Sequence, residues 1–189
     1  MDDLRVFIAV KIDSPIQRIL ASIQSDLKKS GADVKWVNVE GIHLTLKFLG
    51  DITFAQLNQI QPAMEQSCRR KPFSISIKGL GAFPKIDQPR IIWTEITEEK
   101  NELKLLAEEL EKNLEAAGFP KEGRDFHAHI TLGRARSAQR QFALVKLLKE
   151  YTLPEIPAQQ VSQITLFKST LTSDGPVYES LVQIPLRVS

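Results

Sequence analysis

Two short segments of the sequence each combine a histidine with a threonine two residues later. The first contains His43 and Thr45 in the run HLTLKFLG, and the second contains His129 and Thr131 in HAHITLGR. An imidazole near its ordinary pKa accepts or donates a proton around neutral pH, and a hydroxyl can donate a hydrogen bond to an anionic oxygen. Two such pairs facing each other supply a general base, a general acid and two donors for a phosphoryl group. This chemistry can open a cyclic phosphodiester with water, without a metal or a covalent intermediate.

Both segments have the apolar and β-branched composition of a β-strand. Residues i and i+2 of a strand point to the same face, so each histidine shares a face with its threonine while the leucine or isoleucine between them turns toward the core. The chain contains three histidines, and all of them lie in these two segments. A single histidine in an apolar strand is as often structural as functional, but a repeated H-x-T-L pattern favours function.

The third histidine, His127, precedes His129 by two residues and is therefore expected on the same face. Together with His43, these two residues also have the composition of a three-histidine metal site of the catalytic zinc type. The repeated threonines have no part in that alternative, and no carboxylate stands beside the histidines to orient them. We therefore expect no metal ligands and no cofactor, and we assign His127 to the rim of the site or to a spacing role.

Other residues near the two segments carry weaker signals. Arg134 ends the second segment and is a candidate for binding substrate phosphate, although a solvated arginine is an equally good interpretation. Lys47 continues the face of His43 and is expected at the rim. Four aromatic residues are expected mostly in the core, with one or two available to stack on a base: Phe7, Phe48, Phe83 and Trp93.

The composition is that of a globular protein with a substantial core. The 189 residues are 42% hydrophobic and 25% charged, with a formal net charge of +2. No apolar run approaches the roughly 18 residues needed to cross a bilayer, so we expect no membrane association. The single Cys68 excludes an internal disulfide and favours the cytoplasm. A small phosphate-bearing ligand fits this charge better than a long nucleic-acid duplex does.

The order of the expected elements suggests two rounds of a similar unit. The predicted helices cover about 14–30, 53–68, 98–117 and 137–151, and the segment 81–89 is expected to be a loop. The predicted strands are 4–11, 34–39, the two H-x-T-L segments, 73–80, 90–96, 160–171 and 177–187. We predict an α+β fold of two similar lobes, each with an antiparallel sheet and helices, with the active-site cleft between them. Residues 1–189 are expected to form this single bilobal domain, as a monomer.

At these residues the chain resembles the two-histidine (2H) phosphoesterase superfamily, which is defined by two H-x-[ST]-x motifs. It is most similar to the LigT-like branch, the RNA 2′,3′-cyclic phosphodiesterases, also called the 2′-5′ RNA ligase family. The likeness spans nearly the whole chain. Its pieces are RVFIAV, HLTLKFLG, FPKIDQPRIIW, FHAHITLGR, STL and GPVY, in that order.

The resemblance implies metal-independent opening of RNA 2′,3′-cyclic phosphate to a 2′-phosphate end. It also implies catalytic roles for His43, Thr45, His129 and Thr131, with His129 as the base and His43 as the acid or the reverse. RNA carrying such an end, or a small cyclic nucleotide, is then the expected substrate, and some relatives join RNA halves through a 2′-5′ linkage. One departure is Ala128, where the branch usually has a proline before the catalytic histidine.

The sequence leaves open two alternatives to this enzyme. A non-catalytic binder of nucleotides or RNA ends would keep the same site without turnover, although it would not need two proton-transfer groups. A metal-dependent hydrolase would use the three histidines, and removal of the metal by a chelator would stop it.

Overall fold

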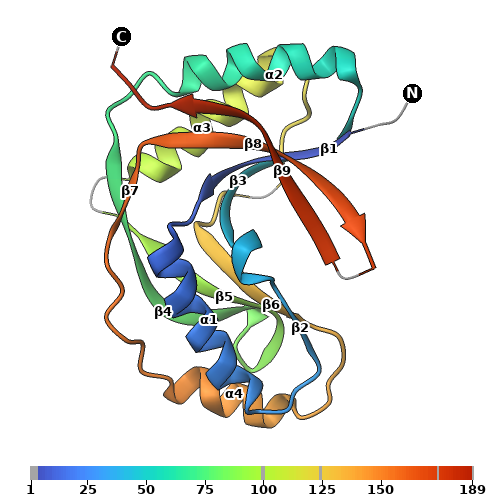
Figure 1. The fold of residues 1–189 in the computed structure, drawn as a ribbon, viewed down its shortest axis with the longest axis vertical. Helices are drawn as coiled ribbons and strands as arrows, with labels where there is room; N and C mark the ends of the chain where they lie inside the picture. Colours follow the sequence, from blue (N-terminus) through green and yellow to red (C-terminus); the bar gives the residue numbers. More distant parts are fainter. Residues whose placement is uncertain (1–3, 99–100, 124, 174, 189) are drawn as a thin grey trace.

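The structure is a computed structural model that describes residues 4–98, 101–123, 125–173 and 175–188. Its helices and strands follow the predicted order (Figure 1). The elements are β1 Leu4–Lys11, α1 Ser14–Lys28, β2 Val34–Trp36, a 3₁₀ turn Val39–Gly41, β3 His43–Ile52, α2 Phe54–Ser67, β4 Phe73–Lys85, β5 Gln88–Thr97, α3 Glu102–Ala116, β6 His129–Ala135, α4 Gln141–Glu150, β7 Gln159–Val161, β8 Gln163–Thr172 and β9 Gly175–Pro185.

Two antiparallel sheets form the two lobes (Figure 1). Sheet A has the strand order β3-β1-β8-β9, and sheet B has the order β2-β6-β5-β4-β7. The two H-x-T-L segments are β3 in sheet A and β6 in sheet B, and these strands contact each other where the lobes meet. The α+β class and the two similar lobes predicted from the sequence are therefore confirmed.

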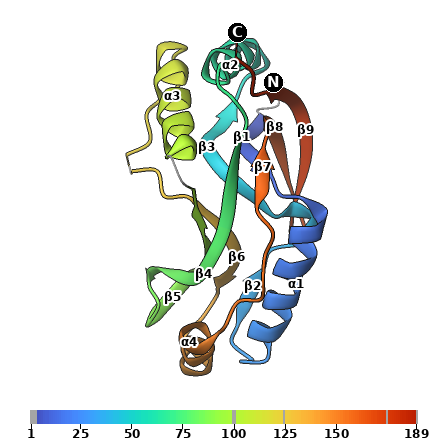
Figure 2. The same ribbon diagram turned by 90° about the vertical axis from the view of Figure 1, so that its left-hand side faces the viewer.

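The first helix of each half crosses to the opposite lobe (Figures 1 and 2). Helix α1 follows β1 of sheet A but lies beside α4 on sheet B, where the Tyr151 hydroxyl donates a hydrogen bond to Asp26 at 2.7 Å. Helix α3 follows β5 of sheet B but packs against α2 on sheet A, where Arg70 pairs with Glu109 at 2.6 Å. Strands are exchanged as well, since β4 pairs with β5 in sheet B and β8 pairs with β1 in sheet A. Each lobe therefore contains elements from both halves of the chain.

The helices form where their apolar stripes predicted them. A capping box at the start of α2 joins Thr53, its N-cap residue, to Gln56. Pro62 lies inside this helix. The leucine and isoleucine residues that repeat at helical spacing along α1 and α3 are buried, with Ile19 only partly so. The buried members are Ile16, Leu20, Ile23, Leu27, Leu103, Leu106, Leu110 and Leu114.

Other boundaries differ from the predictions. Strand β4 runs on to Lys85, through much of the segment expected to be a loop, because it pairs with β5 almost to the hairpin end. Helices α3 and α4 are shorter than expected at their N-terminal ends, where Asn101 and Arg140 adopt left-handed backbone angles. No helix in the described ranges is long and apolar enough to cross a bilayer.

Candidate active site

The two predicted catalytic histidines are held in the same way. His43 Nδ1 lies 2.7 Å from the carbonyl oxygen of Gly41, and His129 Nδ1 lies 2.7 Å from that of His127. A carbonyl oxygen only accepts hydrogen bonds, so Nδ1 must carry a proton in both rings. The Nε2 atom of each ring is then the one available to exchange a proton with a substrate. Repetition of this contact fixes the same tautomer in both halves of the protein.

Aromatic side chains of sheet A surround His43. Its ring lies 4.6 Å from Phe7 and 5.1 Å from Tyr178, measured between centroids, and the Tyr178 contact is edge-on at 87°. Phe167 stacks on Phe7 at 5.3 Å and extends this aromatic group. Phe7 was predicted within a set of aromatic residues expected mostly in the core, with one or two available to stack on a base, whereas Phe167 and Tyr178 were not singled out from the sequence. For Tyr178 the available signal was its place in the GPVY segment.

A second group of aromatic side chains in sheet B surrounds His129. Phe83 of β4 meets the His129 ring edge-on at 5.2 Å, and Trp93 of β5 lies 6.1 Å from it. His127 contacts the same two rings at 5.4 and 5.2 Å and is itself exposed. Phe83 and Trp93 are therefore part of the wall around a predicted catalytic residue rather than general core.

Strand β3 has a β-bulge directly after its H-x-T triplet. Thr45 pairs with Ala9 of β1, and the next pair along the strands joins Lys47 to Ile8, which leaves Leu46 as the extra residue. An extra residue in one strand changes which of the following side chains face each side of the sheet. His43 and Thr45 remain on one face and are both partly exposed.

Strand β6 has a β-bulge at the corresponding place. Thr131 pairs with Trp93 of β5, and the next pair joins Gly133 to Ile92, so that Leu132 is the extra residue. The repeated motif is therefore a strand with a defined irregularity and not merely a sequence pattern. In both lobes the bulge follows the threonine immediately.

The bulges decide where the neighbouring residues point. Lys47 was predicted at the rim of the site, and that prediction is wrong, because the bulge turns its side chain to the opposite face, where it is 2% exposed. Phe48 and Arg134 are each the second residue after a bulge, and both are exposed. We place Arg134 on the same face as His129 and Thr131 for this reason.

Electrostatic effects link the two lobes through Arg134. Burial raises the pKa of Tyr178, and the nearby positive charge of Arg134 partly opposes that effect. The same arginine contributes to lowering the pKa of His129. Since Tyr178 contacts His43 and strands β3 and β6 contact each other, Arg134 of β6 lies near groups of both lobes.

Both histidines are shifted toward their neutral forms. Burial lowers the pKa of His43 below the ordinary 6.5, although its hydrogen bond to Gly41 partly opposes this. Burial also lowers the pKa of His129, and the charges of His127 and Arg134 lower it further, against the hydrogen bond to the His127 carbonyl. Each imidazole therefore loses its extra proton at a lower pH than an exposed histidine does.

These shifts predict an acidic optimum for kcat/KM. One histidine must be neutral and the other protonated in the free enzyme, so the optimum lies between their two pKa values, both of which are below 6.5. Removing the Arg134 charge by Arg134→Met should raise the pKa of His129 and move one limb of the profile to higher pH. The measurement is the pH dependence of kcat/KM on a 2′,3′-cyclic nucleotide. A wild-type optimum above pH 6.5, or a limb moving to lower pH in the variant, would contradict it.

The three-histidine alternative requires a different arrangement. Within the described ranges, no three histidine, cysteine, aspartate or glutamate side chains are grouped so that they could hold one metal ion. His43 and His129 come from different lobes, and the hydrogen bond at Nδ1 of each ring leaves Nε2 free, which by itself does not distinguish a proton-transfer group from a metal ligand. The geometry thus favours the paired acid and base over a metal centre built on His43, His127 and His129.

The fold and site define a protein of two repeats, each bringing one histidine-threonine strand to a shared interlobe site. The sequence model of the family described as LigT like Phosphoesterase matches the chain twice, over residues 10–93 and 95–178. This chain belongs to that family. Each match contains one H-x-T-L strand, which confirms the two-repeat organisation.

Related sequences and solved structures align with nearly all of the chain. An RNA 2′,3′-cyclic phosphodiesterase of Aquifex aeolicus is 38% identical over 182 residues, which is 94% of this chain and 95% of the relative. One of Aeropyrum pernix is 36% identical over 87% of this chain and 93% of the relative. Among solved structures, Escherichia coli LigT superposes with a TM-score of 0.80 at 22% identity, over 99% of both chains. A Thermus thermophilus protein reaches 0.75 at 27% identity, over 97% of this chain and 98% of that one.

Proposed function

We propose that this protein is an RNA 2′,3′-cyclic phosphodiesterase that opens the cyclic phosphate to a 2′-phosphate by acid-base catalysis, without a metal. The observation that carries this proposal is the repeated site, in which two histidines hold the same tautomer beside two threonines. The named relatives, which are 36% and 38% identical over most of both chains, support the substrate class. We assign residues 1–189 to one bilobal unit that needs no cofactor and acts as a monomer.

The proposed reaction is a single displacement at phosphorus. The Nε2 atom of neutral His129 takes a proton from water as the water oxygen bonds to phosphorus. The bond from phosphorus to O3′ breaks, and the Nε2–H of protonated His43 gives its proton to O3′. The products are a 2′-phosphate and a free 3′-hydroxyl. The near-symmetry of the site fits the exchanged roles of the two histidines equally well.

The hydroxyls and the arginine act on the phosphate group. In this proposal Thr45 and Thr131 donate hydrogen bonds to its two non-bridging oxygens, where negative charge must be stabilised as the bond to water forms. Arg134 is assigned to binding the phosphate, because its charge reaches both Tyr178 beside His43 and His129 itself. A guanidinium suits this role, since it presents several donors to phosphate oxygens at once.

The function is tested by hydrolysis of 2′,3′-cyclic AMP and of a short RNA with a 2′,3′-cyclic phosphate end, in excess EDTA. We expect turnover that EDTA does not reduce, and a product whose phosphate is on the 2′ oxygen. Phosphorus NMR identifies the position of the phosphate. Turnover that EDTA abolishes would support a metal hydrolase, and tight binding of a 2′-phosphorylated nucleotide without turnover would support a binder.

A further inference from the structure

Each bulge in the H-x-T-L strands has a polar contact with the crossing helix of the other repeat, and one side chain in each contact is buried. The bulge of β6 is contacted from α1, which belongs to the first repeat, and the bulge of β3 is contacted from α3, which belongs to the second. The side chains differ in chemistry, but their places in the two lobes correspond. Neither contact was anticipated from the sequence.

In sheet B the contact is made by Gln24 of α1, which is 1% exposed. Its Nε2 donates to the carbonyl oxygen of Leu132, the extra residue of the bulge, at 2.8 Å, and to that of Val37 at 2.9 Å. The Leu132 oxygen also accepts a hydrogen bond from Val37 N at 2.9 Å. Both hydrogens of a buried amide are thus used at the bulge, where the regular ladder is interrupted.

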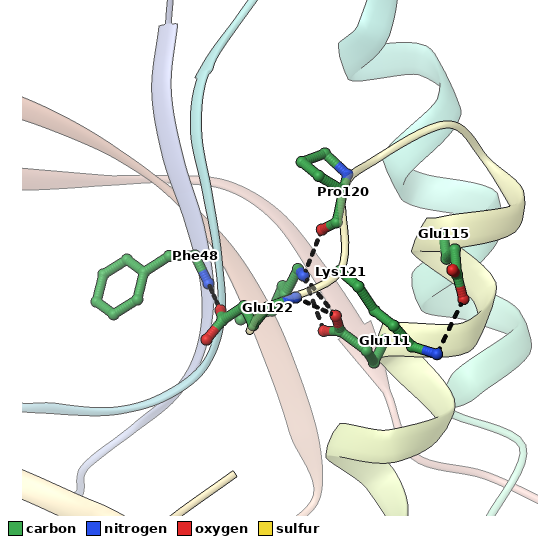
Figure 3. Close-up of polar contacts among 7 residues, drawn as sticks. Phe48, Glu111, Glu115, Pro120, Lys121 and Glu122 are labelled. Atoms are coloured by element: carbon green, nitrogen blue, oxygen red, sulfur yellow. Dashed lines mark hydrogen bonds and ion pairs between the residues drawn. The ribbon is translucent and has the colours of Figure 1, made fainter. Parts of the chain in front are cut away.

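In sheet A the contact is made by an ion pair between Lys47 and Glu111 of α3. The Lys47 ammonium lies 2.8 and 2.9 Å from the two carboxylate oxygens of Glu111, and it donates to the carbonyl oxygen of Pro120 at 2.8 Å. Figure 3 shows the Glu111 side chain and Pro120 beside the strand that carries Phe48. Lys47 is the residue directly after the extra residue Leu46, so fixing its side chain fixes the bulge.

The chain after α3 extends the same network to the next residue of β3 (Figure 3). Glu122 N donates to Glu111 at 2.6 Å, and the Glu122 carboxylate accepts a hydrogen bond from Phe48 N at 2.9 Å. Strand β3 is an edge strand of sheet A, so Phe48 N points out of the sheet there. Removing one partner of a buried ion pair is costly, whereas replacing both with apolar groups is often neutral for stability. Stability alone therefore gives no strong reason for this pair to be present.

We propose that Gln24 and the Lys47–Glu111 pair are positioning residues: Gln24 aims His129 and Thr131, and the ion pair aims His43 and Thr45, each by holding the β-bulge next to that histidine and threonine. This inference rests on the proposed function of the site. Loss of either contact lets the bulge move along its strand, which displaces the threonine and the histidine before it. A misplacement of about 1 Å can cost on the order of 100-fold in rate.

The experiment compares two variants with matched controls in 2′,3′-cyclic AMP hydrolysis. Gln24→Met removes both donors and keeps the side-chain length, while Gln17→Met alters a second buried glutamine of α1, whose Nε2 has no partner within the described residues. Lys47→Met with Glu111→Gln removes the ion pair without leaving a buried charge. Lys104→Met with Glu108→Gln does the same to an exposed pair on α3.

We call Gln24→Met and the double variant of Lys47 and Glu111 the bulge variants. We expect kcat to fall about 10- to 100-fold in each of them, with KM nearly unchanged and both controls close to wild type. The imidazole signals of the three histidines in NMR spectra supply a readout that does not depend on turnover. Gln24→Met should move the His129 signals and leave those of His43, and the Lys47 and Glu111 variant should do the opposite. Equal kcat and signals in Gln24→Met and Gln17→Met, or equal changes at both histidines in either bulge variant, would overturn the proposal. An inactive wild type would instead refute the proposed function, while the NMR signals would still decide the positioning role.

Discussion

Replacing His129 or His43 by alanine is expected to lower kcat about 10²- to 10⁴-fold, the usual contribution of a general acid or base. Each ring supplies a proton-transfer group at Nε2, and an alanine side chain has no such group. The measurement is hydrolysis of 2′,3′-cyclic AMP in EDTA, with circular dichroism to show that both variants are folded. The double variant should lose little more than either single one, since the two residues act as a unit.

The control for this prediction is His127→Ala. His127 holds His129 through its backbone carbonyl, which alanine keeps, and its own ring is exposed. We expect His127→Ala to retain far more activity than His129→Ala. An inactive His127→Ala beside an active His129→Ala would show that the wrong histidine of the segment HAHITLGR has been assigned to catalysis.

Gly81→Ala is expected to destabilise the protein by about 1–3 kcal/mol, the usual cost of an overfilled core site. A Cβ at Gly81 would lie 2.4–2.8 Å from three ring atoms of Trp93, so the indole must move. Trp93 is part of the aromatic wall around His127 and His129, and kcat should fall as well. Urea denaturation gives the free energy of unfolding, and hydrolysis of 2′,3′-cyclic AMP gives kcat.

Two further variants make this prediction specific. Gly123→Ala adds the same methyl group where no atom lies within 4 Å, and we expect a change of no more than about 0.5 kcal/mol. Combining Gly81→Ala with Trp93→Phe removes the indole atoms that would clash and should recover part of the lost stability. Equal stabilities of Gly81→Ala and Gly123→Ala would show that the Trp93 ring moves aside without cost.

The sequence predicted those parts of the site that depend only on residues a few positions apart in the chain. His43 and Thr45 share a face because a strand repeats every two residues, and that period needs no knowledge of the partner strand. The same holds for the buried stripes of α1 and α3, which follow from helical spacing. The two-repeat order was likewise visible, because each repeat carries its own copy of H-x-T-L.

The parts that the sequence did not predict depend on contacts between distant segments. A bulge exists only relative to the strand that it pairs with, so the side on which Lys47 lies could not be read from β3 alone. The environment of His43 combines Phe7 of β1 with Tyr178 of β9, which are far apart in the chain. The crossing of α1 and α3 between the lobes also has no local signal, since a stripe of apolar residues does not say which sheet it will cover.

The exchange of elements between the lobes suggests how the protein was assembled in evolution. Helix α1 and strand β4 of the first repeat complete the second lobe, while α3 and β8 of the second repeat complete the first. Two separate copies of one repeat would interlock in the same way around a twofold axis, as a domain-swapped dimer. A single copy brings only one histidine-threonine pair, so an ancestral repeat would have been active only as that dimer.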